Sequence, residues 1–201
     1  MALVAVFLIL MHPGPREASA KTLPESLVKA FHADLLGVMK DGKNLKITGR
    51  YEKFLVYIDK YFHMPLMVQF VSGKHWNGAS KDARISLVDA ARRLSAAEMA
   101  VLFNGYGGES FRTDGTRSVQ DGSVLVKTSL VRPDNGNVKV IYRTKKFGES
   151  WRIIDVILDG SISQLLKRRG EYNRTLQDSG INGLYALMTN KTDEILKSEN
   201  K

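Results

Sequence analysis

Residues 124–158 read VLVKTSLVRPDNGNVKVIYRTKKFGESWRIIDVIL, and apolar side chains recur at every second position over most of this stretch. A period of two is typical of strands that bury one face. The tetrapeptides PDNG at 133–136 and FGES at 147–150 have the composition of turns. The pattern therefore predicts three antiparallel strands, at 124–130, 138–143 and 151–158.

The last predicted strand carries apolar residues on both faces, which is typical of a strand covered on both sides. Phe111 is expected in a short strand before the first hairpin. The flanking segments instead repeat apolar residues at helical spacing, and Ser80 is a suitable N-cap. Helices are therefore predicted at 23–39, 51–61, 65–71 and 80–104 before the strands, and at 161–176 and 181–196 after them.

Helices, then about four antiparallel strands, then helices again predict an α+β fold. We expect the helices to pack on one side of a curved sheet, in a cone of the NTF2-like or cystatin-like kind. Such an arrangement leaves room for an internal apolar cavity between its two layers. No Pro- or Ser-rich linker interrupts residues 21–201, so we expect them to form a single folded domain.

The chain has 201 residues, 43% of them apolar, with a formal net charge of +9 and no Cys. A chain of this length buries enough surface to fold without disulfides or a metal. The lack of Cys excludes zinc sites built on Cys, iron–sulfur clusters and thiol nucleophiles. A basic surface is typical of proteins that meet nucleic acid, anionic lipid headgroups or an acidic partner, and charge alone does not choose among them.

Residues 1–20 have the pattern of a secretory signal peptide. Residues 2–11 are an apolar run too short to span a bilayer, Pro13-Gly-Pro15 interrupts it, and Ala18-Ser-Ala20 is a small-x-small cleavage site. We therefore expect cleavage after Ala20 and a mature chain outside the cytoplasm. No nucleic acid is expected as a partner there.

Residues with catalytic or metal-binding spacing are sparse. The histidines at 32, 63 and 75 are not part of an HExxH motif, and the sequence has no GxSxG elbow. The sequence therefore predicts no catalytic residue, no cofactor and no metal.

Asp155 and Asp159 share strand parity, so an acid–base pair is one interpretation. The interpretation that the sequence favours is structural. Asp159-Gly160-Ser161 has the composition of a turn and helix cap at the end of the last strand, and Asp155 is expected to make a buried or edge polar contact.

Three stretches resemble one family. YFHMPLMVQFVSGKHW at 61–76, followed by Asn-Gly-Ala-Ser, is similar to the segment of MlaC-type periplasmic lipid-binding proteins in which a short helix ends in a Gly-basic-aromatic-Trp or Tyr signature. WRIIDVILDG at 151–160 resembles their last strand, W-x-x-x-D-V-x-x-(D/E)-G. EYNRTLQDSGINGL at 171–184 resembles their closing segment, in which an acidic-aromatic pair precedes Gly-x-x-Gly-Leu. The order and spacing agree over almost the whole mature chain.

Within that family, YGGESF at 106–111 and DGSISQLLKRR at 159–169 look most like the hopanoid-associated branch called HpnM. The resemblance implies a soluble carrier in the periplasm of a Gram-negative bacterium, without enzyme activity. Such a carrier takes a phospholipid or hopanoid-type lipid between an inner-membrane ABC transporter complex of the MCE type and an outer-membrane lipoprotein complex. We expect a monomer.

A carrier must enclose the lipid tails, because exposing about 16 carbons to water costs roughly 12 kcal/mol. Candidates to line the cavity lie on apolar faces or at element ends near the expected mouth. They are Tyr61, Leu66, Phe70, Tyr106, Phe111, Val126, Tyr142, Ile157 and Ile162. For each of them, packing in the core is an equally open alternative.

Two other functions stay open. The first is a small secreted enzyme of related cone-shaped fold with a site built on Asp155 and Asp159, and it predicts loss of turnover when both become Asn. The second is a structural adaptor that docks by its basic face, for example by the run at 167–169, and it predicts a filled core.

Overall fold

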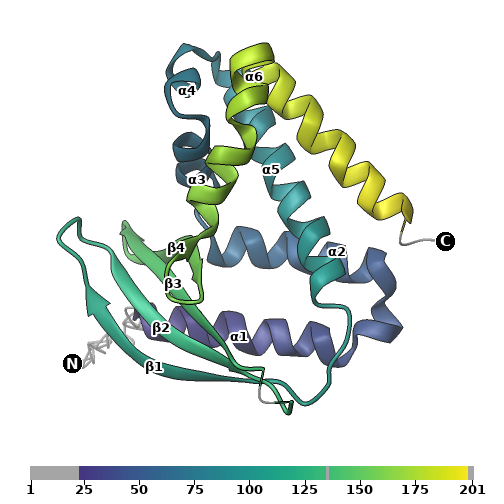
Figure 1. The fold of residues 1–201 in the computed structure, drawn as a ribbon, viewed down its shortest axis with the longest axis vertical. Coiled ribbons are helices and arrows are strands. Elements are labelled where there is room, and N and C mark those ends of the chain that lie inside the picture. The colour runs from purple at the N-terminus through teal and green to yellow at the C-terminus, as the bar shows by residue number, and fades with distance from the viewer. Residues whose placement is uncertain (1–22, 135, 199–201) are drawn as a thin grey trace, which may run out of the picture.

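The computed structural model describes residues 23–134 and 136–198 (Figure 1). The predicted signal peptide at 1–20 lies outside the described residues. The helices are α1 (Pro24–Lys40), α2 (Gly42–Tyr61), α3 (Met64–Ser72), α4 (Lys74–Gly78), α5 (Lys81–Leu102) and α6 (Gln164–Ser198). The strands are β1 (Ser110–Ser118), β2 (Val124–Val131), β3 (Val138–Phe147), β4 (Ser150–Leu158) and β5 (Ile162–Ser163).

The five strands form one sheet in the order β1-β2-β3-β4-β5, and every neighbouring pair is antiparallel. Figure 1 shows the curved sheet beside α1 in the lower part of the molecule, and the helices α2 to α6 above α1. This arrangement confirms the predicted α+β fold. Ser80 also caps α5 as predicted, because its Oγ accepts a hydrogen bond from the Ala83 N–H at 3.2 Å.

Aromatic rings occupy the space between α1 and the sheet. Phe31 meets the Tyr142 ring edge-on with centroids 5.9 Å apart, and His32 stacks on Phe111 at 3.8 Å. Val126 of β2 is fully buried under them. The layers that we expected to enclose a cavity are therefore packed together here, and the apolar pocket described below lies elsewhere.

Two helical segments were missed by the sequence pattern. Helix α2 begins at Gly42, well before the predicted start at 51, and Lys46 breaks its helical geometry with φ 52° and ψ −175°. Helix α4 was not predicted at all. The early part of α2 is held from far along the chain, because the Arg50 guanidinium donates to the carbonyls of Gly42 and Ala100, each at 2.7 Å. The spacing of apolar residues along a segment does not reveal a contact with a residue fifty positions away.

The chain after β4 also differs from the prediction. The helix expected from Ser161 begins at Gln164, because Ile162 and Ser163 pair with the end of β4 as strand β5. Further on, Gly180 breaks the helical geometry of α6 with φ 61° and ψ −156°, a conformation that favours glycine. This break lies between the two helices that were predicted, at 161–176 and 181–196.

Strand β4 is covered on both sides as predicted, since the neighbouring residues Ile153 and Ile154 are both buried. Helix α1 contacts β4, and so do α3 and α6. Among the described residues, no helix combines the length and the apolar character that a bilayer crossing needs.

Candidate functional site

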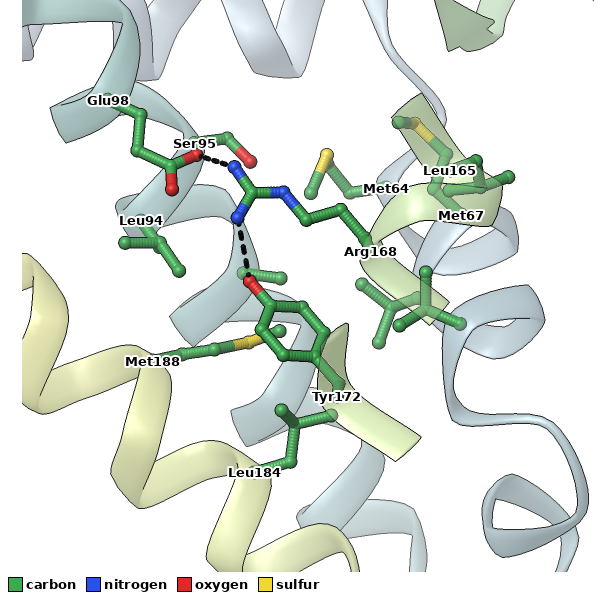
Figure 2. A pocket seen from close by; sticks show the side chains of 13 residues that line it. Met64, Met67, Leu94, Ser95, Glu98, Leu165, Arg168, Tyr172, Leu184 and Met188 are labelled. Atoms are coloured by element: carbon green, nitrogen blue, oxygen red, sulfur yellow. Dashed lines mark hydrogen bonds and ion pairs between the residues drawn. The ribbon is translucent and has the colours of Figure 1, made fainter. Parts of the chain in front are cut away.

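An apolar pocket of about 70 Å³ lies where α3, α5 and α6 meet (Figure 2). Its lining comes entirely from these helices and the sheet contributes nothing to it. The lining residues are Met64, Met67, Val68, Val71, Ala91, Leu94, Ser95, Glu98, Leu165, Arg168, Tyr172, Leu184 and Met188.

Helical spacing brings these side chains to one place. The four lining residues of α3, and likewise the four of α5, follow one helix face at positions i, i+3, i+4 and i+7. The start of α3 is fixed by His63, whose Nδ1 accepts the Leu66 N–H at 3.1 Å. Beyond the break at Gly180, Leu184 and Met188 return along α6 to close the pocket from a third side.

One charged cluster lies in the pocket wall. The Arg168 guanidinium pairs with Glu98 of α5, reaches the Tyr172 hydroxyl at 3.2 Å and the Glu171 carboxylate at 3.3 Å. Figure 2 shows Arg168 between Glu98 and Tyr172, over the apolar lining. Burial alone would lower the pKa of Arg168, but the hydrogen bond to Glu98 and the neighbouring charges raise it above its ordinary value. Arg168 is therefore a permanent cation at the pocket.

Tyr172 is held in the same cluster. Burial raises the pKa of its hydroxyl, so the group stays neutral, and its oxygen accepts a hydrogen bond from Arg168. The Tyr172 ring is buried and also faces the Arg168 guanidinium, 5.9 Å from the ring centroid. The pocket thus combines an apolar floor with one ion pair in its wall, Arg168 with Glu98.

Asp155 and Asp159 lie in different surroundings, one buried and one exposed. The Asp155 carboxylate accepts the Leu165 N–H at 3.1 Å and the Ser163 hydroxyl at 2.6 Å, so it holds the start of α6. Asp159 is exposed at the turn, with a positive φ of 49°. The buried polar contact expected for Asp155 is confirmed, and its carboxylate is engaged in structure.

Replacing Asp155 by Ala is expected to lower the free energy of unfolding by about 2 kcal/mol, because hydrogen bonds to a charged carboxylate at a helix start are lost. The matched variant Asp159→Asn is expected to stay within about 0.5 kcal/mol, since Asn tolerates the positive φ and the site is exposed. Urea unfolding of both variants measures the difference. Equal free energies of unfolding for the two variants would contradict the role of Asp155 in capping the start of α6.

None of the nine predicted lining residues lies in the pocket wall. Tyr61, Val126 and Tyr142 are buried in the core; Leu66, Phe111 and Ile157 are half-buried; Phe70, Tyr106 and Ile162 are exposed. The structure brings Tyr61, Phe111 and Tyr142 together around α1, where Phe31 or His32 contacts each of their rings. Phe70 and Leu66 belong to α3, which does line the pocket through its other face.

The pocket residues that sequence reasoning missed had a usable pattern. Met67, Val68 and Val71 share one face of the helix predicted at 65–71, but the pattern does not say which partner covers that face. Arg168 belongs to the basic run at 167–169, and residue types alone do not show that one of these cations pairs with Glu98 beside a pocket. Within residues 23–134 and 136–198, no group of three or more His, Cys, Asp or Glu is arranged to hold a metal ion.

Comparisons with known proteins point in one direction. The model of a family described as MlaC protein matches residues 29–190. A phospholipid-binding protein from Ralstonia solanacearum, solved at 1.53 Å in complex with a phospholipid, superposes with a TM-score of 0.73 at 17% sequence identity. The alignment covers 86% of this chain and 98% of that one, and it shows a shared fold. No curated protein matches this chain.

Proposed function

The chain belongs to the MlaC family, and from this premise we propose that it is a phospholipid-binding carrier, a binding or transport protein rather than an enzyme. The observation that carries the proposal is the apolar pocket among α3, α5 and α6 with Arg168 in its wall. The structural neighbour from Ralstonia solanacearum, which was solved with a phospholipid, supports the same ligand class.

The pocket must widen to take a lipid tail. Its volume of about 70 Å³ is well below the roughly 300–1,000 Å³ typical of ligand sites. Three methionines, Met64, Met67 and Met188, line it. Because unbranched thioether side chains change rotamer easily, they can move aside for a tail and fill the space again after release. We propose that the described conformation is the closed, lipid-free form.

Arg168 is the group that we propose for the lipid headgroup. Its guanidinium presents a fork of N–H donors, which suits a phosphate oxygen pair as well as a carboxylate. In the lipid-bound form, a headgroup phosphate takes part of the place that Glu98 now holds beside Arg168. The Arg168 guanidinium is then paired with an anion in both forms, with Glu98 in the closed form and with the headgroup phosphate in the lipid-bound form.

The finer parts of the proposal follow the family. We propose that residues 1–20 are a secretory signal, that residues 21–201 are one lipid-binding domain, and that the mature chain shuttles lipid across the periplasm between the inner-membrane transporter complex and the outer-membrane complex. A hopanoid is the alternative cargo, since an apolar wall accepts ring systems as well as tails. The nine lining residues predicted from the sequence stay predictions for the widened form.

Protein purified without detergent from its native host is expected to carry extractable lipid at close to one molecule per chain. Mass spectrometry of the extract names the cargo and separates phospholipid from hopanoid. Preparations that are repeatedly free of lipid, and that also fail to take lipid from vesicles of phosphatidylethanolamine and phosphatidylglycerol, would contradict the carrier.

A further inference from the structure

The charge of the chain is concentrated on its sheet. The strands β1 to β4 carry eight Lys or Arg residues and only two Asp, whereas the whole chain has 30 basic and 21 acidic residues. A local excess of this size is not a by-product of the overall composition. Whether these side chains form one charged surface depends on the side of the sheet to which they point.

The strand register places most of these cations on the side of the sheet away from α1. Phe111 and Tyr142 face α1, because their rings contact His32 and Phe31. Side chains alternate along a strand, so the intervening positions of β2 and β3 point outward. In β1, Arg112 pairs with outward Ser129, and the bulge between Thr113 and Gly115 shifts the alternation so that Arg117 pairs with outward Leu125. We call this surface the basic sheet face, and its cations are Arg112, Arg117, Lys127, Lys139, Arg143 and Lys145.

Carboxylates neutralise only part of the basic sheet face. Arg112 pairs with Asp114 and Arg143 with Asp121, each at 2.6 Å. Arg117, Lys127, Lys139 and Lys145 form no ion pair within the part of the chain that the structure describes. The face therefore keeps a net charge of +4, six cations less two carboxylates, from the chain total of +9.

We propose that the basic sheet face is the surface by which the protein meets a lipid bilayer rich in anionic headgroups. Its unpaired cations are spread over three adjacent strands about 4.8 Å apart. Mobile headgroups can gather under cations in any such arrangement, whereas a folded acidic partner needs carboxylates at matching positions. The half-buried Leu125 and Ile141 lie between the cations and leave the face without an exposed large apolar side chain. The contact is thus electrostatic and reversible, as a carrier that must leave the membrane requires.

The inference goes beyond the proposed function, because it concerns the approach to the bilayer and leaves the cargo pocket on α3, α5 and α6 untouched. It rests on that function only in taking a membrane as the destination. The two are tested apart by measuring vesicle binding and bound lipid on the same samples.

The test is flotation of the full mature chain with vesicles. The wild-type protein is expected to float with vesicles of about one-third phosphatidylglycerol in phosphatidylcholine at about 50 mM salt, and to be released at about 0.5 M salt or with phosphatidylcholine alone. The triple variant Arg117→Gln, Lys127→Gln, Lys139→Gln is expected to lose roughly 100-fold in partitioning, because each charge near an anionic surface contributes about fivefold.

The matched control changes three exposed helical lysines, in the variant Lys43→Gln, Lys53→Gln, Lys191→Gln, which has the same net charge. It is expected to keep most of the binding. Equal loss in both triple variants would show that net charge alone acts and would overturn the assignment of the face. Failure of the wild-type protein to bind anionic vesicles at low salt would overturn it too, and would leave an acidic protein as the partner. If the sheet variant still carries lipid in its pocket, the proposed carrier function is supported whichever of these results is obtained for vesicle binding.

Discussion

Replacing Ala91 by Phe is expected to reduce the bound lipid by about tenfold or more while the chain still folds. Ala91 is a small residue of α5 in the pocket wall, only 6% exposed, and the space in front of it measures about 70 Å³. A phenyl ring in that space takes the volume into which a tail would enter. Each tenfold loss of affinity corresponds to about 1.4 kcal/mol, which is within the cost of forcing a tail into an overpacked site.

The measurement is lipid extracted per mole of protein purified without detergent, together with uptake of a fluorescent phospholipid from vesicles. The control is Ala186→Phe, which puts the same ring on an exposed position of α6, between Leu184 and Met188 but facing away from the pocket. A second variant, Ala91→Leu, adds fewer atoms and guards against misfolding, because it is close to a cavity-filling change. Full lipid uptake by folded Ala91→Phe and Ala91→Leu would show that the cargo binds elsewhere.

The free energy of unfolding is expected to fall by about 3 kcal/mol between pH 7 and pH 4 through His32 alone. Burial of the imidazole between α1 and the sheet lowers the pKa of His32 to about 4 from its ordinary value of 6.5. Between pH 6.5 and about pH 4, His32 is therefore protonated in the unfolded chain and neutral in the folded chain. Stability from this group is complete above pH 6.5 and is lost as the pH falls through the window to about 4.

Two variants isolate the effect. His32→Phe keeps a ring to stack on Phe111 and cannot take a proton, so its stability should change about 3 kcal/mol less over the window than that of the wild-type chain. Tyr142→Phe removes the partner that lies 3.1 Å from His32 Nε2 and keeps the imidazole, so its pH dependence should persist. Urea unfolding at several pH values measures both. The pKa of His63 is also lowered by burial, and that contribution remains in every variant. A pH dependence of His32→Phe equal to that of the wild type would contradict the assignment.

Local patterns in the sequence were sufficient for most elements. The alternation in residues 124–158 predicted β2, β3 and β4, and Ser80 predicted the start of α5, because periodicity and capping act between residues close in the chain. The pattern did not find the start of α2, since Arg50 holds it through a carbonyl fifty residues away. The same limit applies to β5, whose two residues are strand only because β4 pairs with them.

By itself, the sequence determined the α+β class, the family resemblance and the excess of positive charge. The tertiary structure decided where these features meet. Arg168 and Glu98 are 70 residues apart, and only the crossing of α5 and α6 makes them partners beside an apolar pocket. A helix pattern shows which face is apolar but not what covers it, because that depends on the packing of elements distant in the chain. For this reason the pocket lies among the helices, while aromatic rings from α1 fill the space beneath the sheet.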